Sequence, residues 1–94
     1  LHSAITRQSI DGLPVGGWYP EEKLTAEESV RGYTTGAAYA AFVENQTGTL
    51  EVGKWADITV LNKDVLNVGT KSPADLLDGR VLMTISAGEI VYKQ

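Results

Sequence analysis

The sequence lacks cysteine and has a single histidine, so it is poor in the side chains that most often bind transition metals. Without cysteine it can form neither a disulfide framework nor a thiolate metal site, and this fits a cytoplasmic protein. Basic residues are also scarce: 8 lysines and arginines stand against 12 aspartates and glutamates, for a net charge of −4. A nucleic-acid partner is not expected, because binding to phosphates requires a basic surface.

Long apolar runs are missing as well. No stretch approaches the roughly 18 to 20 apolar residues that a membrane span needs, and the start does not resemble a secretory signal. We therefore expect no membrane partner. With 94 residues and 43 % apolar content, the chain is expected to form a small globular domain with a thin core. It opens on Leu1 rather than methionine, which we interpret as the start of a segment from within a longer protein.

The first quarter of the chain reads as the end of a helix followed by a loop. Residues 1–8 are mildly apolar, and Ile5 stands one helical turn after Leu1. Residues 9–24 are rich in glycine and proline, which predicts a loop. Trp18 and Tyr19 lie inside it. Two large aromatic residues are unusual in a flexible linker, so we expect them to pin the loop onto a neighbouring surface.

The main helix is predicted over residues 25–43. Thr25 and Glu28 form a capping box, and apolar residues then recur at helical spacing through about Phe42. Small residues spaced four apart would share one smooth face of this helix, open to close approach by another backbone: Gly32, Gly36 and Ala40. A break near Thr34-Thr35, giving two shorter helices, is the alternative.

The second half has the pattern of a small β structure. Strands are predicted at 57–61, 81–86 and 89–92, with Ala87-Gly88 as the tight turn of a C-terminal antiparallel hairpin. Between the first two strands, 62–71 is predicted to be a loop. A single short helical turn then begins with Ser72 as its cap and ends at Gly79. The predicted fold class is α+β.

A search for chemistry finds no catalytic or metal-binding constellation. His2 stands alone, without carboxylates at ligand spacing, and no Gly-x-Ser-x-Gly motif exposes a nucleophile. The acidic pair Glu21-Glu22 lies in the loop and Glu27-Glu28 caps the helix. Asp57 precedes a strand and is expected to make a turn bond to a nearby backbone N–H rather than act as a base. We predict no catalytic residue and no metal ligand.

Arg7 and Trp18 are the two candidate binding residues. Arg7 lies close to the aromatic loop and could bind a substrate carboxylate at the rim of a pocket, with Trp18 beside it. A surface salt bridge is the alternative role for Arg7.

Three blocks of sequence, taken together, resemble the C-terminal end of metal-dependent amidohydrolases. They are Leu24-Thr-Ala-Glu-Glu-Ser-Val-Arg-Gly-Tyr-Thr-Thr-Gly-Ala-Ala, Gly48-Thr-Leu-Glu-Val-Gly-Lys-Trp-Ala-Asp-Ile-Thr-Val-Leu and Val81-Leu-Met-Thr-Ile-Ser-Ala-Gly-Glu-Ile-Val-Tyr. The second is similar to the family motif G-x-L-x-x-G-x-x-A-D. The upstream segments Ala4-Ile-Thr-Arg7 and Gly16-Gly-Trp-Tyr-Pro20 make the chain most similar to the third amidohydrolase subfamily, which includes N-substituted formamide deformylases.

The resemblance implies a parent enzyme with a (β/α)₈ barrel and a small β domain built from both chain ends. Residues 1–46 would belong to the end of the barrel, and 47–94 would form the C-terminal part of an incomplete β domain. The parent would use a divalent metal, usually zinc, to hydrolyse carbon–nitrogen bonds other than peptide bonds. Neither its metal ligands nor its catalytic motifs map onto this sequence, so no cofactor is expected here.

Three functions follow as hypotheses. The first is a catalytically inert structural portion of the parent, whose partners are the barrel and the N-terminal strands, and which self-associates when isolated because a sheet edge is exposed. The second is an independent binding module that uses the Trp18/Tyr19 loop. The third is a small enzyme that uses Arg7 and a carboxylate.

Overall fold

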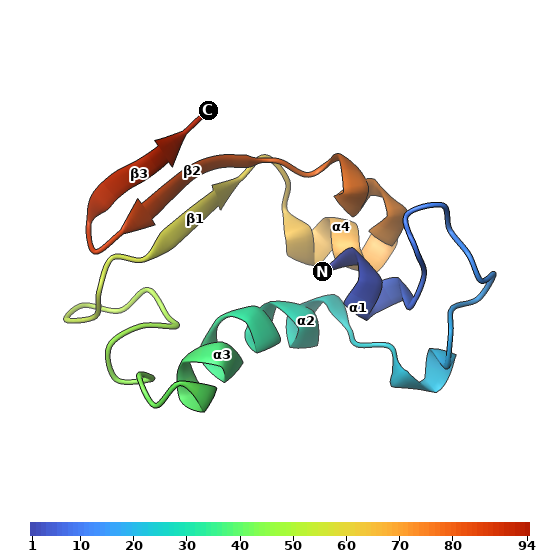
Figure 1. Cartoon of the computed structure of the whole chain (residues 1–94), viewed down its shortest axis with the longest axis horizontal. Coiled ribbons are helices and arrows are strands. Elements are labelled where there is room, and N and C mark those ends of the chain that lie inside the picture. The colour runs from blue at the N-terminus through green and yellow to red at the C-terminus, as the bar shows by residue number, and fades with distance from the viewer. The chain divides into compact units, whose positions relative to one another are not determined.

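The computed structural model describes residues 1–94 and contains helices together with one small antiparallel sheet (Figure 1). The α+β fold class is confirmed. In chain order the elements are α1 (His2–Thr6), the 3₁₀ turn η1 (Pro20–Glu22), α2 (Ala26–Tyr33), α3 (Thr35–Ala40), β1 (Ile58–Leu61), α4 (Val65–Lys71), the 3₁₀ turn η2 (Pro73–Asp78), β2 (Val81–Ser86) and β3 (Glu89–Lys93). No helix has the length and apolar content that a membrane span requires.

The chain divides into two compact units, and each is built from two separate stretches of sequence. The helical unit consists of Leu1–Val30 and Lys63–Gly79, and the sheet unit consists of Arg31–Asn62 and Arg80–Gln94. The boundary between residues 46 and 47, which the resemblance to amidohydrolases implies, stays a prediction.

The helical unit packs around a very small core. Ile5 and Ala26 are buried, and Gly69 of α4 lies directly against both. A Cβ atom added at Gly69 would lie 3.0 Å from Ala26 Cβ and 3.1 Å from Ile5 Cδ1. Residue 69 therefore has no room for a side chain unless its neighbours move, and glycine lets α4 approach α1 and α2 closely.

The capping box at the start of α2 is confirmed. The backbone N–H of Thr25 donates to Glu28 Oε1 at 2.9 Å, and the backbone N–H of Glu28 donates to Thr25 Oγ1 at 3.1 Å. Both bonds satisfy amide groups that the first turn of a helix leaves without an intrahelical acceptor.

The prediction of one main helix over 25–43 is wrong in its continuity, and the alternative break near Thr34-Thr35 is the correct one. Thr34 has φ −118° and ψ −89°, outside the helical range, and it separates α2 from α3. The second helix ends at Ala40, and Phe42 turns into the left-handed region with φ 61°. The small residues predicted to share one face are thus divided between two helices.

The predicted loop over 62–71 is also wrong, because most of it forms helix α4. Asp64 is its N-cap, with a side chain that accepts a bond from the backbone N–H of Asn67 at 3.2 Å. The predicted turn after Ser72 does form, as η2 with Pro73 in its first position. Ser72 is the N-cap residue of this turn, as predicted, although its side chain makes no capping hydrogen bond.

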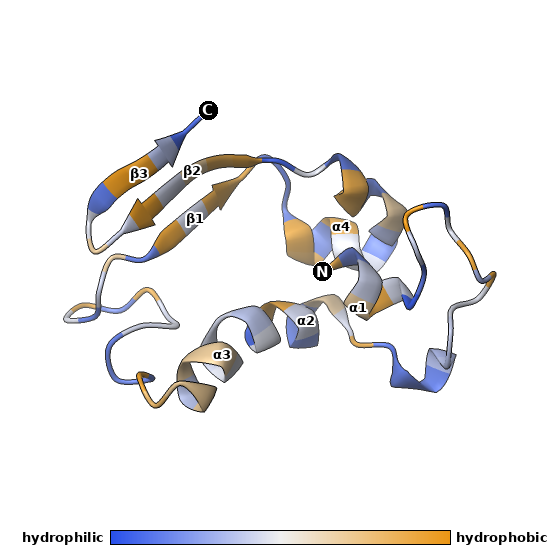
Figure 2. Cartoon of the chain, viewed as in Figure 1, coloured by the Kyte–Doolittle hydropathy of each residue, from blue (hydrophilic) through white to orange (hydrophobic).

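The sheet has the strand order β1-β2-β3, with both pairs antiparallel. All three predicted strands are confirmed, and the hairpin turn has positive φ at both Ala87 (49°) and Gly88 (83°), as a type I′ turn requires. Figure 2 shows hydrophobic residues along all three strands. Ile58, Ile85 and Ile90 lie opposite one another across the sheet and form one apolar row on it.

Ser29 in α2 is an unusual buried residue, since it is only 2 % exposed and its hydroxyl has no hydrogen-bond partner. Burying an unpaired hydroxyl is unfavourable. We expect Ser29→Ala to raise the free energy of unfolding by about 1 kcal/mol, since it removes that penalty and improves helix propensity. Urea denaturation measures the change. Ser3→Ala, at an exposed helical position, is the matched control, and an equal gain there would assign the whole effect to propensity.

Candidate functional site

Residues 9–24 are fastened to α1 at two points, one on each side of the 3₁₀ turn η1. The backbone N–H of Trp18 donates to the carbonyl of Arg7 at 2.9 Å, and that of Leu24 donates to the carbonyl of Ala4 at 3.0 Å. The segment is therefore anchored rather than free, but the prediction that the side chains of Trp18 and Tyr19 pin it onto a neighbouring surface is wrong. Its anchors are backbone groups, and the aromatic side chains remain largely exposed: Trp18 is 60 % exposed and Tyr19 is 56 % exposed.

Arg7 and Trp18, predicted together as candidate binding residues, are in direct contact. The guanidinium Cζ of Arg7 lies 5.1 Å from the centre of the Trp18 ring, and Arg7 Nε donates to the Trp18 carbonyl at 2.9 Å. The Tyr19 ring meets the Trp18 ring edge to face, with centroids 4.6 Å apart and planes at 85°. A cation and two aromatic rings thus form one cluster, which we call the Arg7 cluster (Arg7, Trp18, Tyr19).

The alternative role for Arg7, a surface salt bridge, is not what the structure has. Its guanidinium forms no ion pair within the chain, and its Nε is the only guanidinium nitrogen with a hydrogen bond. The two terminal Nη groups are left as donors without an acceptor. Because an arginine offers paired donors in a planar fork, this edge matches a carboxylate.

The backbone beside Trp18 is strained. Arg7 and Tyr19 both adopt left-handed conformations, with φ 57° and 50°. Such conformations cost a residue with a side chain about 1 to 2 kcal/mol, and they are more frequent at functional sites than elsewhere.

Within the same loop, the Ser9 hydroxyl donates to Asp11, and this bond lowers the pKa of the Asp11 carboxyl below its ordinary value.

The Gly48–Leu61 block, which carries the family-like motif, is held together by polar contacts in the sheet unit. Asp57 accepts a hydrogen bond from the Thr47 hydroxyl at 3.0 Å and another from the backbone N–H of Ala87 at 2.9 Å. It therefore fastens the turn of the β2–β3 hairpin to the entry of β1. Asp57 does accept a bond from a backbone N–H, but the prediction of a nearby turn partner is wrong, because the donor, Ala87, is 30 residues away.

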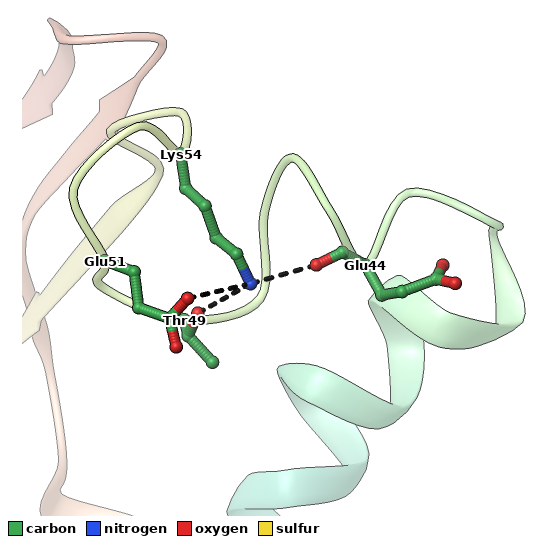
Figure 3. A network of polar contacts seen from close by, with 4 residues as sticks. All are labelled: Glu44, Thr49, Glu51 and Lys54. Atoms are coloured by element: carbon green, nitrogen blue, oxygen red, sulfur yellow. Dashed lines mark hydrogen bonds and ion pairs between the residues drawn. The ribbon is translucent and has the colours of Figure 1, made fainter.

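Lys54 closes the preceding turn in a similar way (Figure 3). Its Nζ donates to the carbonyl of Glu44 at 2.9 Å and to Thr49 Oγ1 at 2.8 Å, and lies 3.6 Å from Glu51 Oε2. Only 17 % of its side chain is exposed, against 64 % for Glu51. Lys54 and Asp57 therefore both have structural roles. The sequence predicted such a role only for Asp57.

Replacing Asp57 tests whether its role is structural. We expect Asp57→Ala to lower the free energy of unfolding by about 1 to 3 kcal/mol, because it leaves Ala87 and Thr47 without their acceptor. Asp57→Asn should recover most of this loss, because its amide oxygen can still accept from Ala87 and the Thr47 hydroxyl can rotate to accept from the amide nitrogen. Chemical denaturation of both variants gives the comparison. An Asn variant as unstable as the Ala variant would contradict the proposed geometry.

The residues present do not fit a metal centre. No group of three or more histidine, aspartate or glutamate side chains is placed to hold an ion. His2, the single histidine, lies in α1 and is 9 % exposed.

Comparison with known proteins gives the family. The model of the amidohydrolase family matches residues 1–92, almost the whole chain. The chain belongs to the amidohydrolase family. It is similar to the N-substituted formamide deformylase of Arthrobacter pascens, with 32 % identity over all 94 residues, and to the protein YtcJ of Bacillus subtilis, with 30 % identity over the same length. It is also 43 % identical over 44 residues, 47 % of the chain, to the imidazolonepropionase of Bdellovibrio bacteriovorus, where it covers 10 % of that protein.

The match covers only a small part of each relative. The chain spans 16 % of the length of the deformylase and 17 % of the length of YtcJ. No solved structure matches it significantly.

Proposed function

We propose that these residues are the C-terminal structural portion of a metal-dependent hydrolase that acts on carbon–nitrogen bonds other than peptide bonds. The observation that carries the proposal is the family match over residues 1–92, joined to a similarity along the full chain with a deformylase that is about six times longer. The divalent metal, zinc in our proposal, and the catalytic residues would belong to the rest of the parent. The cysteine-free composition supports a cytoplasmic location.

The polar contacts of the Gly48–Leu61 block support a structural role. Asp57 and Lys54 use their side chains to fasten turns within the sheet unit, and neither is left with a free edge directed at a ligand. In the proposed parent this portion completes the small β domain, and residues 1–46 continue the barrel.

Separating the chain from its parent and then recombining the two tests this function. We expect the parent protein without these 94 residues to lose hydrolysis of an N-substituted formamide, and addition of the separate chain to restore part of it. Calorimetric titration of the chain alone with zinc should release no binding heat. Hydrolysis by the chain alone, or one equivalent of zinc retained after dialysis, would overturn the proposal.

We further propose that the isolated chain self-associates through β3. This strand pairs only with β2, so its outer rim is free, and all five of its residues are exposed. Two copies of β3 aligned antiparallel about Val91 would place Glu89 of each opposite Lys93 of the other. Opposite charges facing each other across strands are stabilising, and like charges are destabilising.

Charge reversal tests this surface. Light scattering of the unaltered chain should give a dimer mass, and Glu89→Lys should shift it toward the monomer because it places lysine opposite Lys93. The double variant Glu89→Lys with Lys93→Glu should restore the dimer. A monomer at every concentration of the unaltered chain, or a double variant that behaves like the single one, would rule out β3 as the interface.

A further inference from the structure

The exposed aromatic pair beside Arg7 is not explained by packing within the chain. Trp18 and Tyr19 are 60 % and 56 % exposed although the backbone on both sides of them is fastened to α1. Exposing large aromatic surfaces is unfavourable, and the left-handed conformations of Arg7 and Tyr19 add strain. These features coincide with a guanidinium that has unpaired donors.

Arg7 and Trp18 are joined by two reciprocal bonds, one between their backbones and one that holds the Arg7 side chain. Its carbonyl accepts from the Trp18 N–H at 2.9 Å, and its Nε donates to the Trp18 carbonyl at 2.9 Å. The guanidinium Cζ also lies over the indole ring, 5.1 Å from its centre, a contact that favours this position of the cation. A fixed guanidinium loses little conformational entropy when an anion binds its remaining edge.

We propose that the Arg7 cluster binds a carboxylate that is attached to an aromatic group. The two Nη groups of Arg7 would donate to the carboxylate oxygens, and the exposed faces of Trp18 and Tyr19 would cover the aromatic part. Charge-assisted bonds to a carboxylate are about twice as strong as neutral ones, and the aromatic contacts add specificity.

This inference rests on the proposed function in one respect, the substrate class. If the parent hydrolyses a carbon–nitrogen bond, the cluster favours substrates that carry a carboxylate next to an aromatic ring. The binding step itself involves only residues of the helical unit, so it can be measured without the parent and without any reaction.

The experiment uses the full chain with Trp55→Phe, so that Trp18 is the only tryptophan. N-acetyl-L-phenylalanine is titrated while Trp18 fluorescence is followed, and we expect a saturable change in the millimolar range or below. N-acetyl-L-phenylalaninamide lacks the carboxylate and acetate lacks the ring, and each should bind about tenfold more weakly or worse. Equal affinity for the acid and its amide, or no saturable response, would overturn the proposal.

Arginine variants locate the binding on the cluster. Arg7→Lys keeps the charge but removes the planar fork, and it should weaken binding of the acid about tenfold. Arg80→Lys, in the sheet unit, should leave it unchanged. The emission spectrum of Trp18 without ligand shows whether Arg7→Lys also alters the loop. If it does, the comparison of the acid with its amide on the Trp55→Phe chain decides the question, because that chain keeps Arg7. If the chain does not bind the acid but restores activity to the truncated parent, only this inference is refuted. If the chain binds the acid but does not restore activity, only the proposed function is refuted.

Discussion

Gly17→Ala should detach residues 9–24 from α1 and dismantle the Arg7 cluster. Gly17 has φ 95°, and a Cβ atom there would lie 2.5 Å from the backbone oxygen of Thr6. Backbone cannot yield as a flexible side chain does, so the loop must move away. We expect the free energy of unfolding to fall by about 2 to 4 kcal/mol, from left-handed strain and steric overlap together.

Gly16→Ala is the matched control for this substitution. Gly16 also has positive φ, 82°, but a Cβ atom there meets nothing within 4 Å. Only the strain remains, and the loss should be about 1 kcal/mol. Denaturation gives the two energies, and Trp18 emission, measured with Trp55→Phe, should move to longer wavelength only in the Gly17 variant. Equal losses in the two variants would show that residue 17 is not closely packed.

Gly48→Ala is expected to have a comparable effect on the sheet unit. Its φ is 102°, and an added Cβ atom would lie 2.9 Å from Ala38 Cβ and 3.4 Å from the Thr34 carbonyl oxygen. Strain and overlap act together again, so we expect a loss of about 2 to 4 kcal/mol. For a domain whose total stability is of the order of 5 kcal/mol, this removes a large part of the free energy of unfolding.

Gly53→Ala is the matched control for Gly48→Ala, because it separates backbone strain from steric overlap. It has φ 95° and nothing within 4 Å of an added Cβ atom, so it reports strain alone, about 1 kcal/mol. Thermal and urea unfolding of both variants measure the difference. If Gly53→Ala were the more damaging change, the close contact between Gly48 and α3 would not be the feature that limits stability.

The elements that were predicted correctly are those with local causes. The capping box at Thr25 and Glu28 involves residues three apart, and the hairpin turn at Ala87-Gly88 involves neighbours. Alternation of apolar residues likewise identified β2. In each case the sequence pattern is local, although β2 is stabilised by pairing with β1 and β3.

The wrong predictions concern elements whose limits depend on tertiary contacts or on a weak local signal. The break at Thr34 interrupts a pattern whose helical periodicity continues on both sides, so the pattern alone could not select it. Helix α4 had a usable signal, Asp64 followed by Val65, Leu66 and Val68, which a search for N-cap residues could have found.

The binding role of Arg7 and Trp18 stays a prediction, and the contact between their side chains could not be predicted from the sequence. That contact depends on a loop conformation set by Gly17 and two left-handed residues. The role of Lys54 was missed, because its partners Glu44 and Thr49 lie on the far side of a turn that composition does not define.

The long-range bond between Asp57 and Ala87 cannot form during synthesis until both residues have left the ribosome. As the ribosome extends the chain, Asp57 emerges long before Ala87, and β1 has no strand to pair with until β2 follows it. Until then the nascent segment presents an unprotected apolar strand to chaperones and to other chains. A premature stop codon before Ala87 would make that exposure permanent, and such a product is expected to be degraded or to aggregate.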